Sequence, residues 1–258
     1  MNYEKEEQIE KKCIPKVINY FWFGNAEMPD IFYKCVASWK KYCPDYEIKR
    51  WDESNFDISI SNYMIEAYSQ KKYAFVSDYA RFYILEKYGG IYLDIDVELL
   101  KNIDELLYQD AFSGVENNSN FVAPGLILAS QPHNKFCKAV LKFYDENGYK
   151  KLAGETICTI STKILKEQFN YNNKNINEIQ KLNGITIYPS QFFCAYDMIL
   201  KKEEITDDTY SIHHYNASWL GIGDQLKNLI RKIIYIILGK EKYNKLKEKV
   251  KGNKRWKY

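Results

Sequence analysis

The feature that most constrains this chain is an alternation of short β-rich runs with helical stretches between residues 16 and 213. Runs rich in Val, Ile, Tyr, Phe and Trp suit buried strands, and the stretches between them suit helices that cover a sheet. We therefore predict an α/β fold with a central mixed, mostly parallel sheet flanked by helices. The expected strands are 16–23, 47–51, 91–94, 111–113, 126–129, 185–188 and 210–213, and the clearest helices are 29–42 and 74–88.

Composition narrows the class of protein. The 258 residues are 46% apolar and 28% charged, as in an ordinary globular protein with one large core. The first twelve residues are polar and lack the apolar segment of a secretory signal, so we expect no export by that route. The longest apolar run, 233–238, is far shorter than the roughly 20 residues that cross a bilayer. Six scattered cysteines without CxxC spacing favour free thiols and argue against a zinc site.

Charge divides the chain into two parts. Residues 225–258 carry twelve Lys or Arg against two acidic residues, a net charge of +10, whereas residues 1–224 carry −7. We predict one folded domain over 1–224 and a basic amphipathic helical tail over 225–258, because Leu and Ile recur in the tail at helical spacing. Such a tail is typical of a contact with anionic lipid; the alternative is a stripe packed on the domain beneath solvated lysines. The acidic body argues against nucleic acid as a partner.

Two aspartates, Asp94 and Asp96, stand at the end of the strand predicted over 91–94. Because side chains alternate along a strand, both carboxylates project to one side. Two hard oxygen ligands at the carboxyl end of a strand suit Mg²⁺ or Mn²⁺ held against a nucleotide diphosphate. The alternative is a solvated strand end, since Asp-x-Asp often arises by chance in an acidic chain.

A second polar pair lies on the helix just before this strand. Asp78 and Arg81 are three residues apart and so share a helix face. A carboxylate beside a guanidinium suits the recognition of sugar hydroxyls, and an internal salt bridge is the alternative. The pair Gly89-Gly90 lets the backbone turn sharply into the strand, so we expect Asp78, Arg81 and Asp94 to lie close together.

Three blocks of this sequence resemble one family. Residues 77–96, with SDYAR followed by YGGIYLDID, resemble the signature of glycosyltransferase family 32, which includes bacterial capsular-polysaccharide transferases and yeast mannosyltransferases. Residues 14–24 (IPKVINYFWFG) resemble the opening strand of the family, and residues 213–219 (HHYNASW) resemble its closing block. The order and spacing match over most of the chain.

The resemblance implies a GT-A nucleotide-sugar transferase that retains the anomeric configuration and uses a divalent metal. Its motif assigns Asp94 and Asp96 to the ribose and the metal-diphosphate, and Asp78 and Arg81 to the donor sugar. These four residues are the expected catalytic group.

The opening block implies a place for the nucleobase. It puts Pro15 and Trp22 near the base, with Trp22 offering a face for stacking. Asn19 stands where the family usually has histidine, so this resemblance assigns no role to its side chain.

The closing block implies a third metal ligand and further donor contacts. Only one of His213 and His214 can share a strand face with the metal. We expect His214, five residues before Trp219, as in related GT-A enzymes, and an imidazole in the shell suits Mn²⁺ better than Mg²⁺. Ser218 and Trp219 are expected to reach the β-phosphate and to close over it.

The function expected from the resemblance is hexose transfer from a nucleotide-sugar, with UDP as the expected nucleotide, to a glycan or lipid-linked glycan in capsular or cell-surface polysaccharide synthesis. The expected place is the cytoplasm, on the inner face of the plasma membrane. Two alternatives remain: a toxin-like transferase that modifies a protein, and a non-catalytic protein that keeps the fold for binding. The small size of the chain disfavours the first, and its intact acidic motif disfavours the second.

Overall fold

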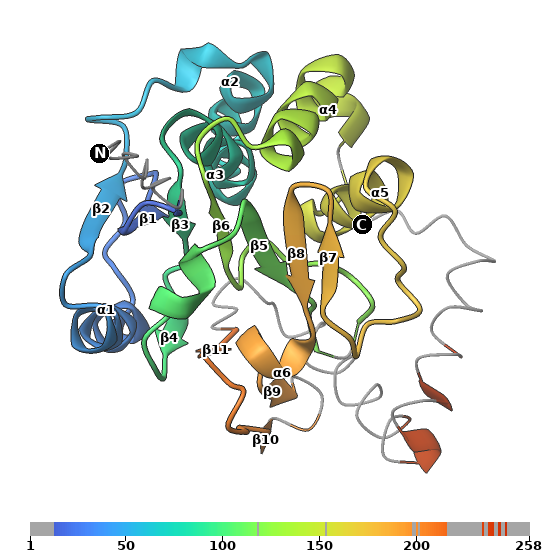
Figure 1. Cartoon of the computed structure of the whole chain (residues 1–258). Helices are drawn as coiled ribbons and strands as arrows, with labels where there is room; N and C mark the ends of the chain where they lie inside the picture. The colour runs from blue at the N-terminus through green and yellow to red at the C-terminus, as the bar shows by residue number, and fades with distance from the viewer. Residues whose placement is uncertain are drawn as a thin grey trace, which may run out of the picture.

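One seven-stranded sheet organises the chain (Figure 1). The computed structural model describes residues 13–117, 119–152, 154–197, 200 and 202–215, with isolated positions between 234 and 246. The sheet has the order β2-β1-β3-β6-β5-β8-β7 and is mixed, as predicted, but with three parallel and three antiparallel pairings it is not mostly parallel. Its strands are β1 (Val17–Phe21), β2 (Glu47–Trp51), β3 (Gly90–Tyr92), β5 (Ala111–Gly114), β6 (Leu128–Ser130), β7 (Gln180–Leu182) and β8 (Ile185–Tyr188).

Helices cover both faces of this sheet. They are α1 (Asp30–Tyr42), α2 (Asn62–Ser69), α3 (Tyr73–Tyr88), α4 (Lys135–Leu152), α5 (Ile157–Gln168) and the short α6 (Ser190–Phe193), with 3-10 turns η1 (Ile58–Ile60) and η2 (Asp104–Leu107). Because side chains alternate along β1, Phe21 packs into the cluster that includes α2 to α5, whereas Ile18 and Tyr20 pack with Trp39 of α1. The core therefore consists of two apolar layers separated by the sheet.

The turn from α3 into β3 explains why two glycines follow the helix. Gly89 and Gly90 have φ angles of 69° and 105°, which favour glycine, and the Gly89 amide donates to the Leu85 carbonyl at 2.9 Å. A Cβ on Gly90 would lie 2.8 Å from the carbonyl oxygen of Val17 in β1. The predicted helix and the strand after it are thus confirmed, and the pair of glycines places β3 directly against β1.

Two small ribbons complete the fold. The strands β9 (Tyr196–Asp197) and β10 (Lys202–Glu203) form one, and β4 (Val97–Leu99) and β11 (Ser211–His213) form the other; both are antiparallel. The β4–β11 ribbon lies along one end of the large sheet in Figure 1. This ribbon places β11, the last described strand, beside the turn that follows β3.

The predicted tail, 225–258, falls almost entirely outside the described residues, as do Ser218 and Trp219. Among the helices that the structure does describe, none is both long enough and apolar enough to cross a membrane.

Candidate active site

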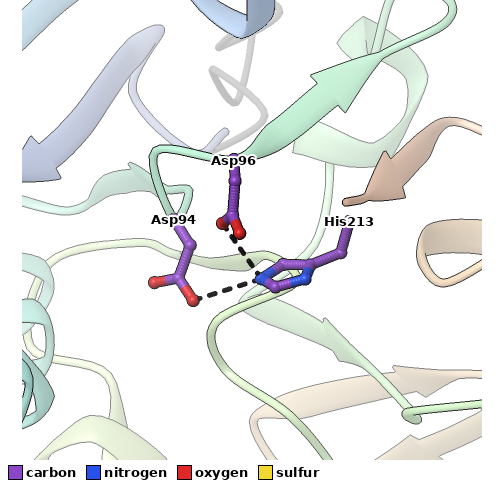
Figure 2. Close-up of side chains that lie close together, drawn as sticks. All are labelled: Asp94, Asp96 and His213. Atoms are coloured by element: carbon purple, nitrogen blue, oxygen red, sulfur yellow. Dashed lines mark hydrogen bonds and ion pairs between the residues drawn. The ribbon is translucent and has the colours of Figure 1, made fainter. Parts of the chain in front are cut away.

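Two aspartates and one histidine meet beyond the carboxyl end of β3. Asp94 and Asp96 lie in the turn between β3 and β4, and His213 ends β11. Figure 2 shows both carboxylates directed at the same ring nitrogen: His213 Nε2 is 3.4 Å from Asp94 Oδ2 and 3.3 Å from Asp96 Oδ1. The three residues offer ligand atoms that all lie within 4.8 Å of one another. Two carboxylates and an imidazole around one point can hold a divalent cation.

His214 does not join this cluster, contrary to the prediction. Its Nε2 lies 2.7 Å from Glu98 Oε2, and Lys34 Nζ lies 2.7 Å from the same oxygen. Burial alone would raise the pKa of Glu98, but the hydrogen bonds from Lys34 and His214 lower it. Consecutive side chains of a strand point to opposite sides, and the pairing of His213 with Val97 puts His213 on the side opposite to Glu98, the partner of His214.

The buried guanidinium of Arg81 contacts two carboxylates of the site, Asp78 and Asp94. Its Nη2 lies 2.8 Å from Asp78 Oδ1, its Nη1 lies 3.5 Å from Asp94 Oδ1, and its Nε donates to the Ser77 carbonyl at 3.2 Å. The guanidinium lies 4.3 Å from the centre of the Tyr92 ring, and the Tyr92 hydroxyl donates to Asp94 Oδ1. Only 5% of the Arg81 side chain is exposed. Arg81 therefore forms an internal salt bridge and acts on the site through Asp78 and Asp94.

The neighbouring carboxylates have pKa shifts of opposite sign. Burial raises the pKa of Asp78 to about 6, although the charge of Arg81 opposes this shift. Burial would also raise the pKa of Asp94, but Arg81, His213 and the Tyr92 hydroxyl together lower it. Burial would lower the pKa of His213, whereas its hydrogen bond to Asp94 and the charge of Asp96 raise it. The site thus keeps Asp94 ionised at a pH where Asp78 begins to bind a proton.

The chain after β11 fixes the orientation of the His213 ring. The backbone N–H of Tyr215 donates to His213 Nδ1 at 3.2 Å, and the two rings lie 4.1 Å apart. With Nδ1 accepting this bond, the proton of the neutral imidazole belongs on Nε2, where it faces the aspartates. A cation at Nε2 would take the place of that proton.

Gly125 leaves the space that the Asp94 side chain fills. The Asp94 amide donates to the Gly125 carbonyl at 3.2 Å, and a Cβ on Gly125 would lie 2.3 Å from Asp94 Oδ2. Gly125 does not have a positive φ, so the requirement for glycine is spatial. Sequence reasoning missed this residue, because Pro124-Gly125 has the composition of an ordinary turn.

The structure brings Trp22 to this end of the sheet but leaves Pro15 at the other, contrary to the prediction for Pro15. β1 and β3 run parallel, so Trp22, directly after β1, lies at the same end as Asp94; its indole N–H donates to the Ala26 carbonyl at 2.7 Å. Pro15 precedes the amino end of β1, and six residues of strand span roughly 20 Å.

Asn19 stands where the family that this sequence resembles usually has histidine, and its side chain has a structural role. It is buried, it accepts a hydrogen bond from Trp51 Nε1 at 2.8 Å, and it donates to the Ile91 carbonyl at 3.3 Å. It therefore links β1 to both of its neighbouring strands.

Comparisons with known proteins agree with this site. Residues 29–113 match the family described as a glycosyltransferase sugar-binding region containing a DXD motif. Inositol phosphoceramide mannosyltransferase 3 of Schizosaccharomyces pombe is 36% identical over 123 residues, which are 44% of this chain and 34% of that protein. An uncharacterized glycosyltransferase of Acanthamoeba polyphaga mimivirus is 24% identical over 222 residues, 80% of this chain and 84% of that protein. The match therefore spans about a third of the length of the yeast relative.

The fold resembles that of a solved glycosyltransferase. The solved structure of PaToxG glycosyltransferase superposes with a TM-score of 0.51 at 17% identity, covering 61% of this chain and 71% of that one. The matched family includes Asp94 and Asp96 within its range. Residues 29–113 of this chain thus resemble the DXD-containing sugar-binding region of glycosyltransferases, and the fold resembles that of PaToxG glycosyltransferase.

Proposed function

We propose that this protein is a retaining, metal-dependent transferase that moves a hexose from a nucleotide-sugar to a glycan or lipid-linked acceptor. The observation that carries the proposal is the meeting of Asp94, Asp96 and His213 within 4.8 Å, next to the buried Asp78–Arg81 pair. The first group suits a cation with its diphosphate, and the second suits the hydroxyls of a sugar.

The ligand set fits Mn²⁺ or Mg²⁺. Two carboxylates and one imidazole leave several positions for diphosphate oxygens, and the imidazole favours Mn²⁺. When bound, such a cation would offset the negative charge that builds on the departing diphosphate. The residues that would hold it are Asp94, Asp96 and His213; His214 is occupied by Glu98.

The protein groups then have distinct tasks toward the donor. Asp78, whose side chain is 13% exposed, and Asp94, 30% exposed, accept hydrogen bonds from sugar hydroxyls. Arg81 fixes both carboxylates, and Trp22 stacks on the nucleobase, for which uracil is our choice. Ser218 and Trp219 would donate to the β-phosphate, in a segment outside the described residues.

Retention of configuration follows from attack on the face that the diphosphate leaves. A bond forms between the acceptor oxygen and the anomeric carbon, the bond from that carbon to the diphosphate oxygen breaks, and the acceptor proton passes to the departing phosphate. Water that enters the site competes with the acceptor, so we expect slow hydrolysis of the donor in its absence.

The acceptor class rests on a relative and on charge. The yeast relative acts, by its name, on inositol phosphoceramide, a lipid with a polyol headgroup. We assign residues 1–224 to catalysis and residues 225–258, with a net charge of +10, to contact with anionic lipid on the inner face of the plasma membrane. The pathway that we favour is capsular or cell-surface polysaccharide synthesis.

The test of the activity is a panel of UDP- and GDP-sugars incubated with Mn²⁺, with release of nucleotide as the readout. Wild-type protein should cleave at least one donor, and Asp96→Asn should abolish this cleavage with little change in melting temperature. Full turnover by Asp96→Asn would refute the site, and binding without any cleavage would identify a non-catalytic protein.

The test of the tail is co-sedimentation with liposomes. The full chain should pellet with anionic vesicles and not with neutral ones, and a chain that stops at Asp224 should pellet with neither. Equal binding by the two chains would remove the assignment of the tail.

A further inference from the structure

A carboxylate beside the candidate active site has no role in the scheme above. Glu116 follows β5 in a hairpin loop that is closed by the bridge between Val115 and Val122, and its amide donates to the Phe121 carbonyl at 2.9 Å. The same loop continues to Gly125, which rests on Asp94. Glu116 and the residue that contacts Asp94 thus belong to the same loop.

The partners of Glu116 are hydroxyl groups. The Tyr215 hydroxyl lies 3.3 Å from Oε1, and Ser119 Oγ donates to Oε2 at 2.8 Å. Asp78, Asp94 and Glu98 each have an arginine or lysine partner, whereas no Lys, Arg or His among the described residues lies within 4.0 Å of Glu116. Its remaining lone pairs can accept further hydroxyl groups.

Glu116 is connected to the candidate active site through Tyr215. The Tyr215 hydroxyl contacts Glu116, and the Tyr215 backbone N–H donates to His213 Nδ1. Glu116 is therefore linked to His213, one of the three candidate cation ligands, by a single residue.

We propose that Glu116 binds the hydroxyl groups of the acceptor, a sugar or another polyol, and so sets the preference of the enzyme for transfer over hydrolysis. This proposal rests on the proposed function. If the acceptor attacks on the face that the diphosphate leaves, it must approach beside the cation ligands. In the proposed function Asp78, held by Arg81, binds the donor sugar, and the link from Glu116 through Tyr215 to His213 leads us to place the acceptor beside His213.

The experiment compares two rates on one donor. Nucleotide release is measured without acceptor and then with methyl α-mannoside, lactose or myo-inositol, and the glycosylated probe is quantified by mass spectrometry. We expect Glu116→Ala to lower the ratio of transfer to hydrolysis by roughly 10- to 100-fold, the loss of one hydrogen bond to a charged group. Glu116→Gln, which still accepts a hydrogen bond, should lower it less.

Two further variants separate acceptor binding from indirect effects. Glu146→Gln, on an exposed and remote part of α4, is the matched control and should leave both rates unchanged. Tyr215→Phe removes the hydroxyl contact with Glu116 and keeps the backbone bond to His213. If it lowers the ratio as much as Glu116→Ala does, Glu116 serves only to position Tyr215 and the proposal is wrong.

Three other results would also overturn the proposal. Transfer and hydrolysis could fall together, the ratio could stay unchanged in Glu116→Ala, or wild-type protein could cleave the donor and glycosylate none of the three probes. A wild-type protein that cleaves no nucleotide-sugar would instead overturn the proposed function.

Discussion

Gly125→Ala tests how tightly the fold determines the position of one carboxylate. The added Cβ would lie 2.3 Å from Asp94 Oδ2 and 3.1 Å from Asp94 Cγ, whereas an ordinary contact needs at least 3.4 Å. The carboxylate must therefore move by about 1 Å, and a misplacement of about that size can cost roughly 100-fold in rate. Oδ2 is the oxygen that faces His213, so the shift acts directly on the cation site.

The assay is Mn²⁺ binding by calorimetry, followed by nucleotide-sugar hydrolysis and thermal unfolding. We expect a fall of roughly 100-fold in hydrolysis, equivalent to about 2.7 kcal/mol, with weaker Mn²⁺ binding and little change in melting temperature. Gly148→Ala is the matched control: no atom lies within 4 Å of its Cβ, but its φ is +67°, so it should cost stability and leave activity intact. Normal Mn²⁺ binding by Gly125→Ala would refute the reasoning.

Four further predictions concern the surrounding charges. His213→Ala should weaken Mn²⁺ binding by more than a factor of about ten while His214→Ala does not, and equal losses in calorimetry would contradict the geometry. Because the pKa of Asp78 rises to about 6 on folding, the folded state binds a proton at a pH where the unfolded state does not. The free energy of unfolding should therefore increase as pH falls from about 6 toward 4. Asp78→Asn should lose this pH dependence in urea titrations. Donor affinity should weaken over the same pH range, and a pH-independent affinity in wild type would exclude Asp78 as a hydrogen-bond acceptor for the sugar. Arg81→Met should cost roughly 3–5 kcal/mol, because it leaves buried Asp78 unpaired; a change below 1 kcal/mol on urea unfolding would mean that the pair is not buried in solution.

Local signals in the sequence were enough to predict the elements that carry the motif. The helix ending at Tyr88, the two glycines and the strand after them are determined by neighbouring residues, so α3, β3 and the proximity of Asp78, Arg81 and Asp94 were predictable. The α/β class followed from the alternation of strand and helix patterns, whereas the three antiparallel pairings of the sheet did not.

Features that depend on distant residues were not predictable in the same way. Which of two adjacent histidines faces the aspartates depends on the register between β11 and β4, and nothing within residues 211–219 specifies that register. Pro15 was misplaced because its motif identifies a strand but not which end of the strand lies at the site. The role of Gly125 depends on its contact with Asp94, and the role proposed for Glu116 depends on its contact with Tyr215. Both partners lie far away in the sequence, so local patterns do not reveal either contact.

The β4–β11 ribbon also determines when the site can first exist during synthesis. His213 is 119 residues beyond Asp94, and the large sheet is already complete at β8. A nascent chain that has folded this sheet on the ribosome therefore holds two aspartates without their histidine, and weak affinity for metal is expected until β11, the last described strand, emerges. Under the proposed function, turnover of the nucleotide-sugar would therefore begin only after β11 has paired with β4.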